Sequence, residues 1–474
     1  MKKNYFLLAM AAGMMSFASC SSDDAVNGSE EWADGDQVIM LDMQDTDVLA
    51  SRSRPLYSTA NMGAEKVTDV KLLVFKIDGS TKTLTKEFNI SNWNNESSDY
   101  QYGRQYTFRI PKADRLESGK YTIVAVGQDE ATETVAPYTW GNPATTLPVL
   151  DITDGATWNS ATTPGNGFAE LIPNAVTADP AEIFSGQSQP VTIGTDGEAF
   201  TATVLLKRQV AGVLGYFDRI PASVDVSGTP TAVTNIRLVA SKKNTKLDLT
   251  INLEDQNDDT TGNDPIECVV NGFELATPSD ATFKYLDAPN NGAYVVYDID
   301  LKEWFTWDTT NNKWADGSTY SDDMGTPSDN TDDITLLNPT AWVNAIDATN
   351  TEVKVADGAV MAGKFMIPFK KFSDAGLDKE TFELQLLGST GAILKSWRVK
   401  LDAGSQNAEL GDGPYVYNIY RNHLYQIGQR GNGDNPNNPG EGGDDPQPLD
   451  KINEQELVIK INDQWEFIHN MEIE

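Results

Sequence analysis

The stretch Glu456–Glu474 reads ELVIKINDQWEFIHNMEIE, and its side chains alternate between apolar and polar. Its even positions offer only two apolar residues, Val458 and Ile468. A period of two is typical of a β-strand with one buried face, because successive side chains point to opposite sides. The apolar residues at the odd positions are Leu457, Ile459, Ile461, Trp465, Phe467, Met471 and Ile473.

The alternation keeps its phase across the polar residues 462–464. A two-residue hairpin at 462–463 would set the apolar face of one arm against the polar face of the other. The pattern therefore favours one long extended segment, with a three-residue loop at 462–464 as the alternative.

A single strand is not stable alone in water, so this one must pair with a sheet edge elsewhere. The preceding residues 428–448 consist mainly of Gly, Pro, Asn and Asp, which predicts a flexible linker over 428–455. Such a linker spans roughly 25 Å as a coil. The strand can therefore reach its own body or a neighbouring molecule, and the function depends on which.

Composition and charge indicate the class of protein. The 474 residues predict two or three domains. With 36 basic and 70 acidic residues the net charge is −34, which argues against nucleic acid or anionic lipid as a partner and indicates a solvated extracellular surface. Abundant Gly, Thr, Asn, Asp and Pro without long helical periodicity predicts a mostly β protein.

The N-terminus has the pattern of a secretory signal peptide, residues 1–19. Phe17-Ala18-Ser19-Cys20 resembles a bacterial lipobox, which implies cleavage before Cys20 and acylation of its thiol. A plain signal peptide with an incidental cysteine is the alternative. If Cys20 is acylated, Cys268 has no partner for a disulfide. The acidic pair in residues 21–24 looks like a surface-export signal.

A first strand is predicted over 37–43, followed by two isolated arginines. Arg52 and Arg54 are the only basic residues between Lys3 and Lys66, which makes them a target for an Arg-specific protease. Pro55 makes the bond after Arg54 a poor substrate, so the Arg52–Ser53 bond is favoured. The alternative is that both are ordinary solvated loop residues.

The remaining chain predicts antiparallel β-sandwiches, because short strands alternate with Gly, Asn, Asp and Pro turns. Residues 129–190 read as an irregular insertion. The similar segments 67–72 and 233–238 suggest two domains of one architecture, over 53–197 and 198–427. The predicted strands are 67–77, 106–110, 120–127, 198–218, 233–243, 246–253, 293–301, 363–369, 382–387, 393–401 and 415–428.

No catalytic motif is present in the sequence, so we expect no enzyme, no cofactor and no metal centre. Only His423 and His469 are available, and neither lies in a nucleophile or zinc motif. The acidic segment 254–267 does not fit an EF-hand, because position twelve would be Cys268. An irregular calcium site in 254–267 or 321–333 stays open beside the simpler interpretation of solvated loops.

In sequence order, these features resemble the fimbrillin family, the type V pilins of Bacteroidetes with their major and minor fimbrial subunits. The likeness rests on the lipobox at Cys20, the arginines at 52 and 54, and Leu206–Val213, which reads LKRQVAGV. It also rests on Tyr420–Tyr425, the polar linker and the Trp-containing terminal strand. The resemblance implies two tandem transthyretin-like β-sandwiches and a C-terminal donor strand.

The resemblance also implies an assembly mechanism. A palmitoylated outer-membrane lipoprotein precursor reaches the cell surface, where an Arg-specific protease removes residues 20–52 with their first strand. A terminal strand from the next subunit, 456–474, fills the groove by donor-strand exchange, which builds a head-to-tail polymer used in cell adhesion. Phe17 in the lipobox and Pro55 after the second arginine depart from the family pattern, so the resemblance does not fix the exact processing bond.

Two alternatives accompany this interpretation. The chain could be a fimbrial tip or accessory subunit, although a donor-like tail argues against an anchor. It could also be a surface lipoprotein that binds glycans or calcium. The tryptophans have no spacing that marks a sugar platform, so packing in loops or the core is favoured over stacking on sugars. These are Trp93, Trp140, Trp158, Trp304, Trp307 and Trp314.

Overall fold

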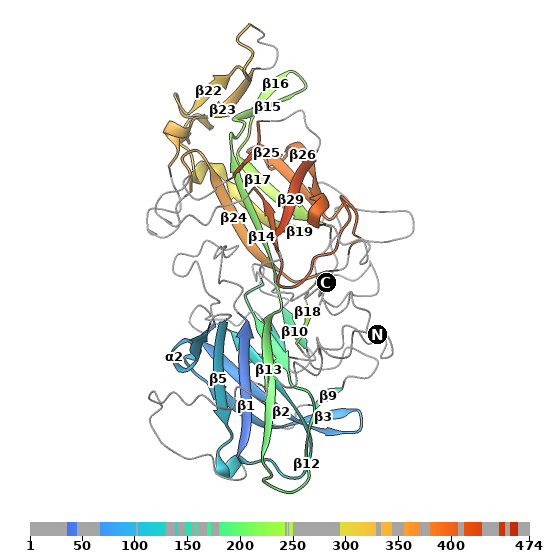
Figure 1. The fold of residues 1–474 in the computed structure, drawn as a ribbon. Helices are drawn as coiled ribbons and strands as arrows, with labels where there is room; N and C mark the ends of the chain where they lie inside the picture. The colour runs from blue at the N-terminus through green and yellow to red at the C-terminus, as the bar shows by residue number, and fades with distance from the viewer. Residues whose placement is uncertain are drawn as a thin grey trace, which may run out of the picture.

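The structure is a computed structural model of residues 1–474. It describes residues 36–44, 67–100, 103–128, 138–140, 147–148, 150, 152, 157–159, 168–171, 180–241, 244, 246–249, 294–328, 333–343, 355–369, 371, 380–405, 412–428, 445–450 and 456–462. The regular secondary structure of these residues is almost entirely β-strand, which confirms the all-β prediction. Figure 1 shows two β-rich bodies, one above the other, connected where β13 runs into β14.

The first body is built around a 10-stranded sheet that folds back on itself. One part runs β4-β5-β1-β13, and β13 leads through β11 into β6-β2-β3-β9, with β12 beside β6. A four-stranded sheet of β18, β10, β7 and β8 lies outside it. The strands are β1 (Gln37–Gln44), β2 (Asp69–Asp78), β3 (Thr81–Ile90), β4 (Ser98–Tyr100), β5 (Gly103–Arg109), β6 (Gly119–Gln128), β7 (Tyr138–Trp140), β8 (Leu147–Pro148), β9 (Thr157–Asn159), β10 (Phe168–Leu171), β11 (Phe184–Gln187), β12 (Val191–Ile193), β13 (Phe200–Arg208) and β18 (Lys246–Asp248).

The second body is built around a 9-stranded sheet in the order β19-β17-β25-β26-β29-β27-β14-β24, with β28 beside β14. Its two end strands, β19 and β24, also lie against each other. Three hairpins, β15–β16, β20–β21 and β22–β23, extend from it. The strands are β14 (Ala211–Asp218), β15 (Ser223–Val226), β16 (Thr229–Ala232), β17 (Asn235–Ala240), β19 (Tyr294–Asp300), β20 (Trp307–Asp308), β21 (Lys313–Trp314), β22 (Thr319–Asp322), β23 (Ile334–Leu337), β24 (Val360–Met366), β25 (Phe382–Leu387), β26 (Ile393–Leu401), β27 (Leu424–Ile427), β28 (Gln447–Pro448) and β29 (Glu456–Asn462).

Helices make only short connections in the described residues. The single α-helix is one turn, α2 (Trp93–Glu96), and its Trp93 is buried in the first body. The 3₁₀ turns are η1 (Lys112–Asp114), η3 (Leu301–Glu303), η4 (Pro339–Ala341) and η5 (Ala403–Ser405). Within the described part of the chain, no helix is long and apolar enough to cross a membrane.

Parallel pairing is the main departure from the antiparallel prediction. β1 runs parallel to β13, β14 runs parallel to β27 and β28, and β26 runs parallel to β29. Hairpins force antiparallel pairing only between strands joined by short turns. β1 and β29 are separated from their neighbours by long segments, so nothing local fixes their direction.

The chain changes sheet between Arg208 and Ala211. β13 pairs with β1 and β11 in the first body, and β14 pairs with β24 and β27 in the second. The apolar run 198–218 therefore contains two strands in different bodies. The similar segments noted in the sequence fall on β2 and β17, one in each large sheet.

Arg208 holds the two bodies together at this crossing. Its Nε donates to Glu182 Oε1 at 2.8 Å in the first body, and its Nη1 donates to Asn422 Oδ1 at 2.8 Å in the second. The side chains of Arg208 and Glu182 are only 10% and 4% exposed. The crossing is therefore fixed by buried charge-assisted hydrogen bonds as well as by the chain itself.

Candidate functional site

The N-terminal strand β1 lies in the interior of a sheet, although it is the first described element of the chain. It pairs along its length with β13 on one side, from Gln37↔Phe200 to Met43↔Leu206. On the other side it pairs antiparallel with β5, from Val38↔Arg109 to Gln44↔Gly103. Removing β1 would therefore leave unpaired backbone groups along both neighbours.

The odd-numbered side chains of β1 fill the core of the first body. Ile39, Leu41 and Met43 are buried in one hydrophobic cluster, whereas Met40 between them is 44% exposed. Burial of such side chains contributes about 1.5–3 kcal/mol each before entropic costs. Without β1, this cluster would be open to water along a strand-shaped groove.

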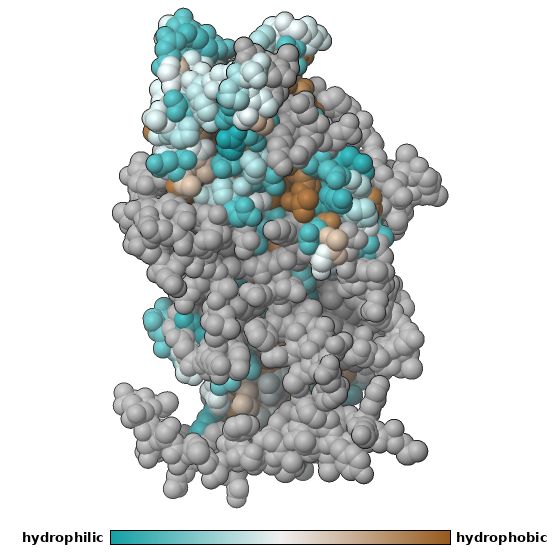
Figure 2. Space-filling model, turned by 45° about the horizontal axis from the view of Figure 1, so that its top comes forward, coloured by the Kyte–Doolittle hydropathy of each residue, from teal (hydrophilic) through white to brown (hydrophobic). Residues whose placement is uncertain are grey.

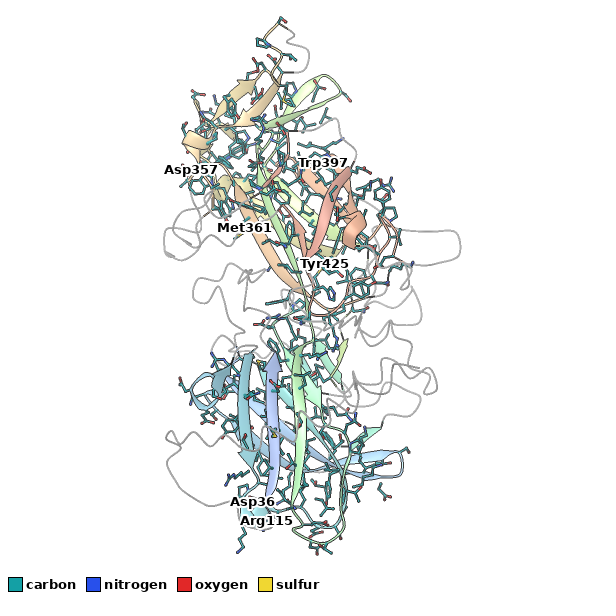
Figure 3. The ribbon with its side chains drawn as sticks, viewed as in Figure 1. Asp36, Arg115, Asp357, Met361, Trp397 and Tyr425 are labelled. Carbon is teal, nitrogen blue, oxygen red and sulfur yellow. The ribbon has the colours of Figure 1, made fainter. Side chains whose placement is uncertain are left out.

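The start of β1 is held by side-chain contacts as well as by the strand ladder. Gln37 Nε2 donates to Leu116 O at 3.1 Å and to Glu198 O at 3.0 Å, and Leu116 N donates to Gln37 Oε1 at 2.7 Å. Asp36 accepts from Arg115 Nη2 at 3.1 Å, and Figure 3 shows this pair at the lower end of the first body. These contacts fix the register of β1.

We expect Gln37→Leu to lower the free energy of unfolding of the first body by about 1–3 kcal/mol, because the buried backbone N–H and C=O of Leu116 lose their partner. Urea denaturation of the purified chain measures this loss. Gln105→Leu is the matched control, since Gln105 lies exposed on the adjacent strand β5. Equal denaturation midpoints for the two variants would contradict the role given to Gln37.

The C-terminal strand β29 lies within the sheet of its own molecule. It runs parallel to β26, with Val399↔Leu457, and antiparallel to β27, with Tyr425↔Ile461. Leu457 is 3% exposed and Val458 is 40% exposed, so the alternation seen in the sequence matches the burial here. A hydrogen bond from Tyr415 lowers the pKa of Glu456 at the start of the strand, and Lys400 lies 3.4 Å away.

Part of the predicted linker also packs against the second body. β28 pairs with the end of β14, and Leu449 beside it is buried. Arg219 binds Asp450 at 2.5 Å and Asp322 at 3.0 Å, which ties the segment before β29 to β22. Burial raises the pKa of the neighbouring Asp218 to about 6. The path into β29 is therefore partly fixed.

Several of the predicted site residues lie outside the described residues. These are the lipidation site Cys20, the processing residues Arg52, Ser53 and Arg54, and the tail residues Trp465, Phe467, Met471 and Ile473. Ile459 and Ile461 are described as backbone of β29 only. The structure brings Leu457, Ile459 and Ile461 together on one strand.

Most of the other side chains considered from the sequence are buried in the fold. His423 is buried, with Nδ1 2.7 Å from Arg421 O. Trp93, Trp140, Trp304 and Trp314 are buried, whereas Trp307 is half-buried. No cluster of three or more His, Cys, Asp or Glu side chains suited to a metal exists among the described residues.

Of the two acidic segments, 254–267 lies outside the described residues. In the described part of 321–333, Asp322 binds Arg219, and the carboxylates of Asp322 and Asp323 accept backbone N–H groups from Met324 and Gly325. These two carboxylates are therefore used within the fold.

The fold is that of an all-β protein whose first and last described strands, β1 and β29, each pair on both sides within a sheet. The model of the fimbrillin-A associated anchor proteins Mfa1 and Mfa2 matches residues 44–312. The chain belongs to this family of fimbrial proteins, which confirms the fimbrillin resemblance. No curated protein sequence matches the chain.

Solved structures of fimbrial proteins are among those similar to the chain. The tip fimbrial protein Mfa3 from Porphyromonas gingivalis is 13% identical, with a TM-score of 0.30 over 82% of this chain and 93% of that one. The fimbrial anchor protein Mfa2 from the same organism is 10% identical, with a TM-score of 0.28 over 85% and 94%. A fimbrial assembly protein from Parabacteroides distasonis is 13% identical, with a TM-score of 0.27 over 84% and 92%.

Proposed function

We propose that the protein is a structural subunit of a cell-surface fimbria that accepts a strand from another subunit after proteolytic loss of β1. The precursor is a lipoprotein acylated at Cys20 and held at the outer membrane. An Arg-specific surface protease cuts at Arg52, and β1 then leaves its groove. The partners are other pilin subunits, and the protein is not an enzyme.

The position of β1 is the observation that carries this proposal. β1 lies between two strands and fills the core, yet only the segment 45–66 joins it to β2. Arg52 and Arg54 lie in that segment. One cut there leaves β1 held by non-covalent contacts alone, so another strand of the same pattern can replace it.

The C-terminal segment has a pattern that suits the groove. Ile39, Leu41 and Met43 are the residues of β1 that lie in the hydrophobic cluster, and Leu457, Ile459 and Ile461 repeat their spacing. Trp465 and Phe467 continue it. Head-to-tail donation of this segment gives an open filament.

A second candidate is a terminal subunit, either an anchor or a tip, that accepts a strand without donating one. The seating of β29 between β26 and β27 favours it, because a strand paired on both sides within its own sheet must leave that sheet before it can donate. In the sequence, the donor-like C-terminal segment argues against an anchor. That argument does not apply while β29 stays paired within its own sheet.

Arg-specific digestion of the purified precursor tests processing. We expect one cut near Arg52, located by intact mass, followed by oligomers in size-exclusion chromatography at high concentration. Arg52→Gln should abolish the cut. Arg54→Gln is the matched control and should leave it, because the bond before Pro55 is a poor substrate. A precursor that stays intact under these conditions would contradict the processing step.

Two experiments with the cleaved chain distinguish a polymerising subunit from a terminal subunit. A chain truncated after Asn462 keeps β29, so loss of polymer in this variant alone places the donor beyond Asn462. Uptake of a synthetic 456–474 peptide without polymer formation identifies a terminal acceptor. Failure of the cleaved chain both to polymerise and to take up the peptide would refute strand exchange.

A further inference from the structure

We propose that a cavity beside the β20–β21 hairpin of the second body binds a neutral pyranose sugar. The cavity has a volume of about 490 Å³ and is lined by residues including Lys302 and Glu303 of η3, Trp307 of β20, Asn312 of the hairpin turn and Val343. Small-molecule sites have volumes of roughly 300–1,000 Å³.

The aromatic wall of the cavity is held rigidly. Trp307 packs edge-to-face on Trp314, with ring centroids 4.7 Å apart and an interplanar angle of 84°. Trp314 is buried and its Nε1 donates to Ala222 O at 3.0 Å. Because Trp314 is fixed, half-buried Trp307 offers a preformed aromatic surface that loses little entropy on binding.

The polar side of the cavity is also fixed by local hydrogen bonds. The Asp308 carboxylate accepts from Thr310 N at 2.9 Å and from Asn311 N at 3.0 Å, which closes the turn. Hydrogen bonds from Asn311 lower the pKa of Asp308, so it stays ionised. The turn places Asn312 at φ 52°, beside the cavity.

Val343 adds an apolar surface on a fixed backbone to the lining. Val343 is 56% exposed, the highest value among the exposed large hydrophobic residues of the described chain. Its N–H donates to Trp304 O at 2.6 Å, and Thr306 N donates to Ala341 O at 3.1 Å. Val343 therefore remains in contact with water when the cavity is empty, and a ligand with an apolar face would remove that contact.

The charged residues of the lining and the net charge of the chain indicate the class of ligand. Lys302 and Glu303 give the cavity one charge of each sign, and Lys302 also pairs with Asp300 at 3.3 Å. The chain carries −34 overall, which disfavours an anion, and a single carboxylate does not make a cation site. A pyranose fits: its C–H face packs on an aromatic ring, and its hydroxyl groups both donate and accept hydrogen bonds.

The residues that line the cavity and strand β1 belong to different bodies. In Figure 1 the gold segment that carries it belongs to the upper body, whereas β1 crosses the lower one. Figure 2 shows the described surface of the upper body as mostly hydrophilic, with a compact hydrophobic area. Sugar binding and processing can therefore be measured separately.

Ligand-observed NMR with the purified full chain and neutral methyl pyranosides tests the proposal. We expect saturation transfer to at least one pyranoside at about 10 mM, above the Kd of about 1 mM of a weak ligand. Trp307→Ala should abolish it, and Trp307→Phe should retain part of it. Asn312→Gly should weaken binding at least threefold while keeping the turn, because glycine accepts a positive φ.

Ser227→Gly is the matched control, since Ser227 has φ 55° in the β15–β16 turn, away from the cavity lining. It should bind like the wild type. The proposal is overturned if no neutral pyranoside binds, if binding is confined to sialylated or sulfated sugars, or if binding survives Trp307→Ala. Circular dichroism of each variant establishes that it is folded.

Discussion

Replacing Leu41 with aspartate is expected to destabilise the first body by about 4 kcal/mol or more, enough to unfold a marginally stable domain. Leu41 is 1% exposed at the centre of β1, and the new carboxylate would lie unpaired in the core between Ile39 and Met43. Urea denaturation and limited proteolysis of the purified precursor measure the loss.

Met40→Asp is the matched control for this change. Met40 is the adjacent residue on the same strand and is 44% exposed, so the same carboxylate meets water. Its effect should stay within about 1 kcal/mol, the range of β-propensity differences. If both variants unfold at the same urea concentration as the wild type, β1 does not occupy its groove in solution, and the proposed assembly loses its basis.

Arg208→Met is expected to cost about 3–5 kcal/mol, because Glu182 would lose its buried cation and Asn422 a charged donor. The loss should appear as weaker cooperativity between the two bodies as well as a lower denaturation midpoint. Differential scanning calorimetry measures both, since uncoupled bodies give two transitions instead of one.

Two further variants test whether the loss of stability comes from the buried contacts of Arg208. Glu182→Gln in the Arg208→Met background should recover part of the stability, because it removes the buried negative charge. Arg398→Met is the matched control, since Arg398 is 47% exposed and its ion pair with Glu380 is screened by water. A similar loss in both arginine variants would show that the position of Arg208 between the bodies has no special effect.

The sequence predicts most of the long strands. Alternation correctly indicates β29, where Leu457 is buried and Val458 is exposed. β2 and β6 are buried on both faces and are indicated instead by nearly continuous apolar runs. The family resemblance and the all-β class also follow from the sequence. Short strands such as β7 and β10 escape detection, because three or four residues carry no readable period.

Strand partners could not be predicted in the same way. The pattern in 456–462 requires a sheet edge but does not say which, and the structure gives β26 and β27. The parallel pairing of β1 with β13 joins residues far apart in sequence, where no turn signal exists. Gln37 and Arg208 are polar residues next to apolar runs, and no local pattern in the sequence indicates their buried partners.

The uninterrupted passage from β13 to β14 has a mechanical consequence. A load that pulls one body away from the other travels lengthwise through β13, which lies alongside β1. The backbone hydrogen bonds between β13 and β1 lie across the direction of this load and bear it together. The two strands therefore resist sliding as a unit, and their hydrogen bonds do not break one at a time.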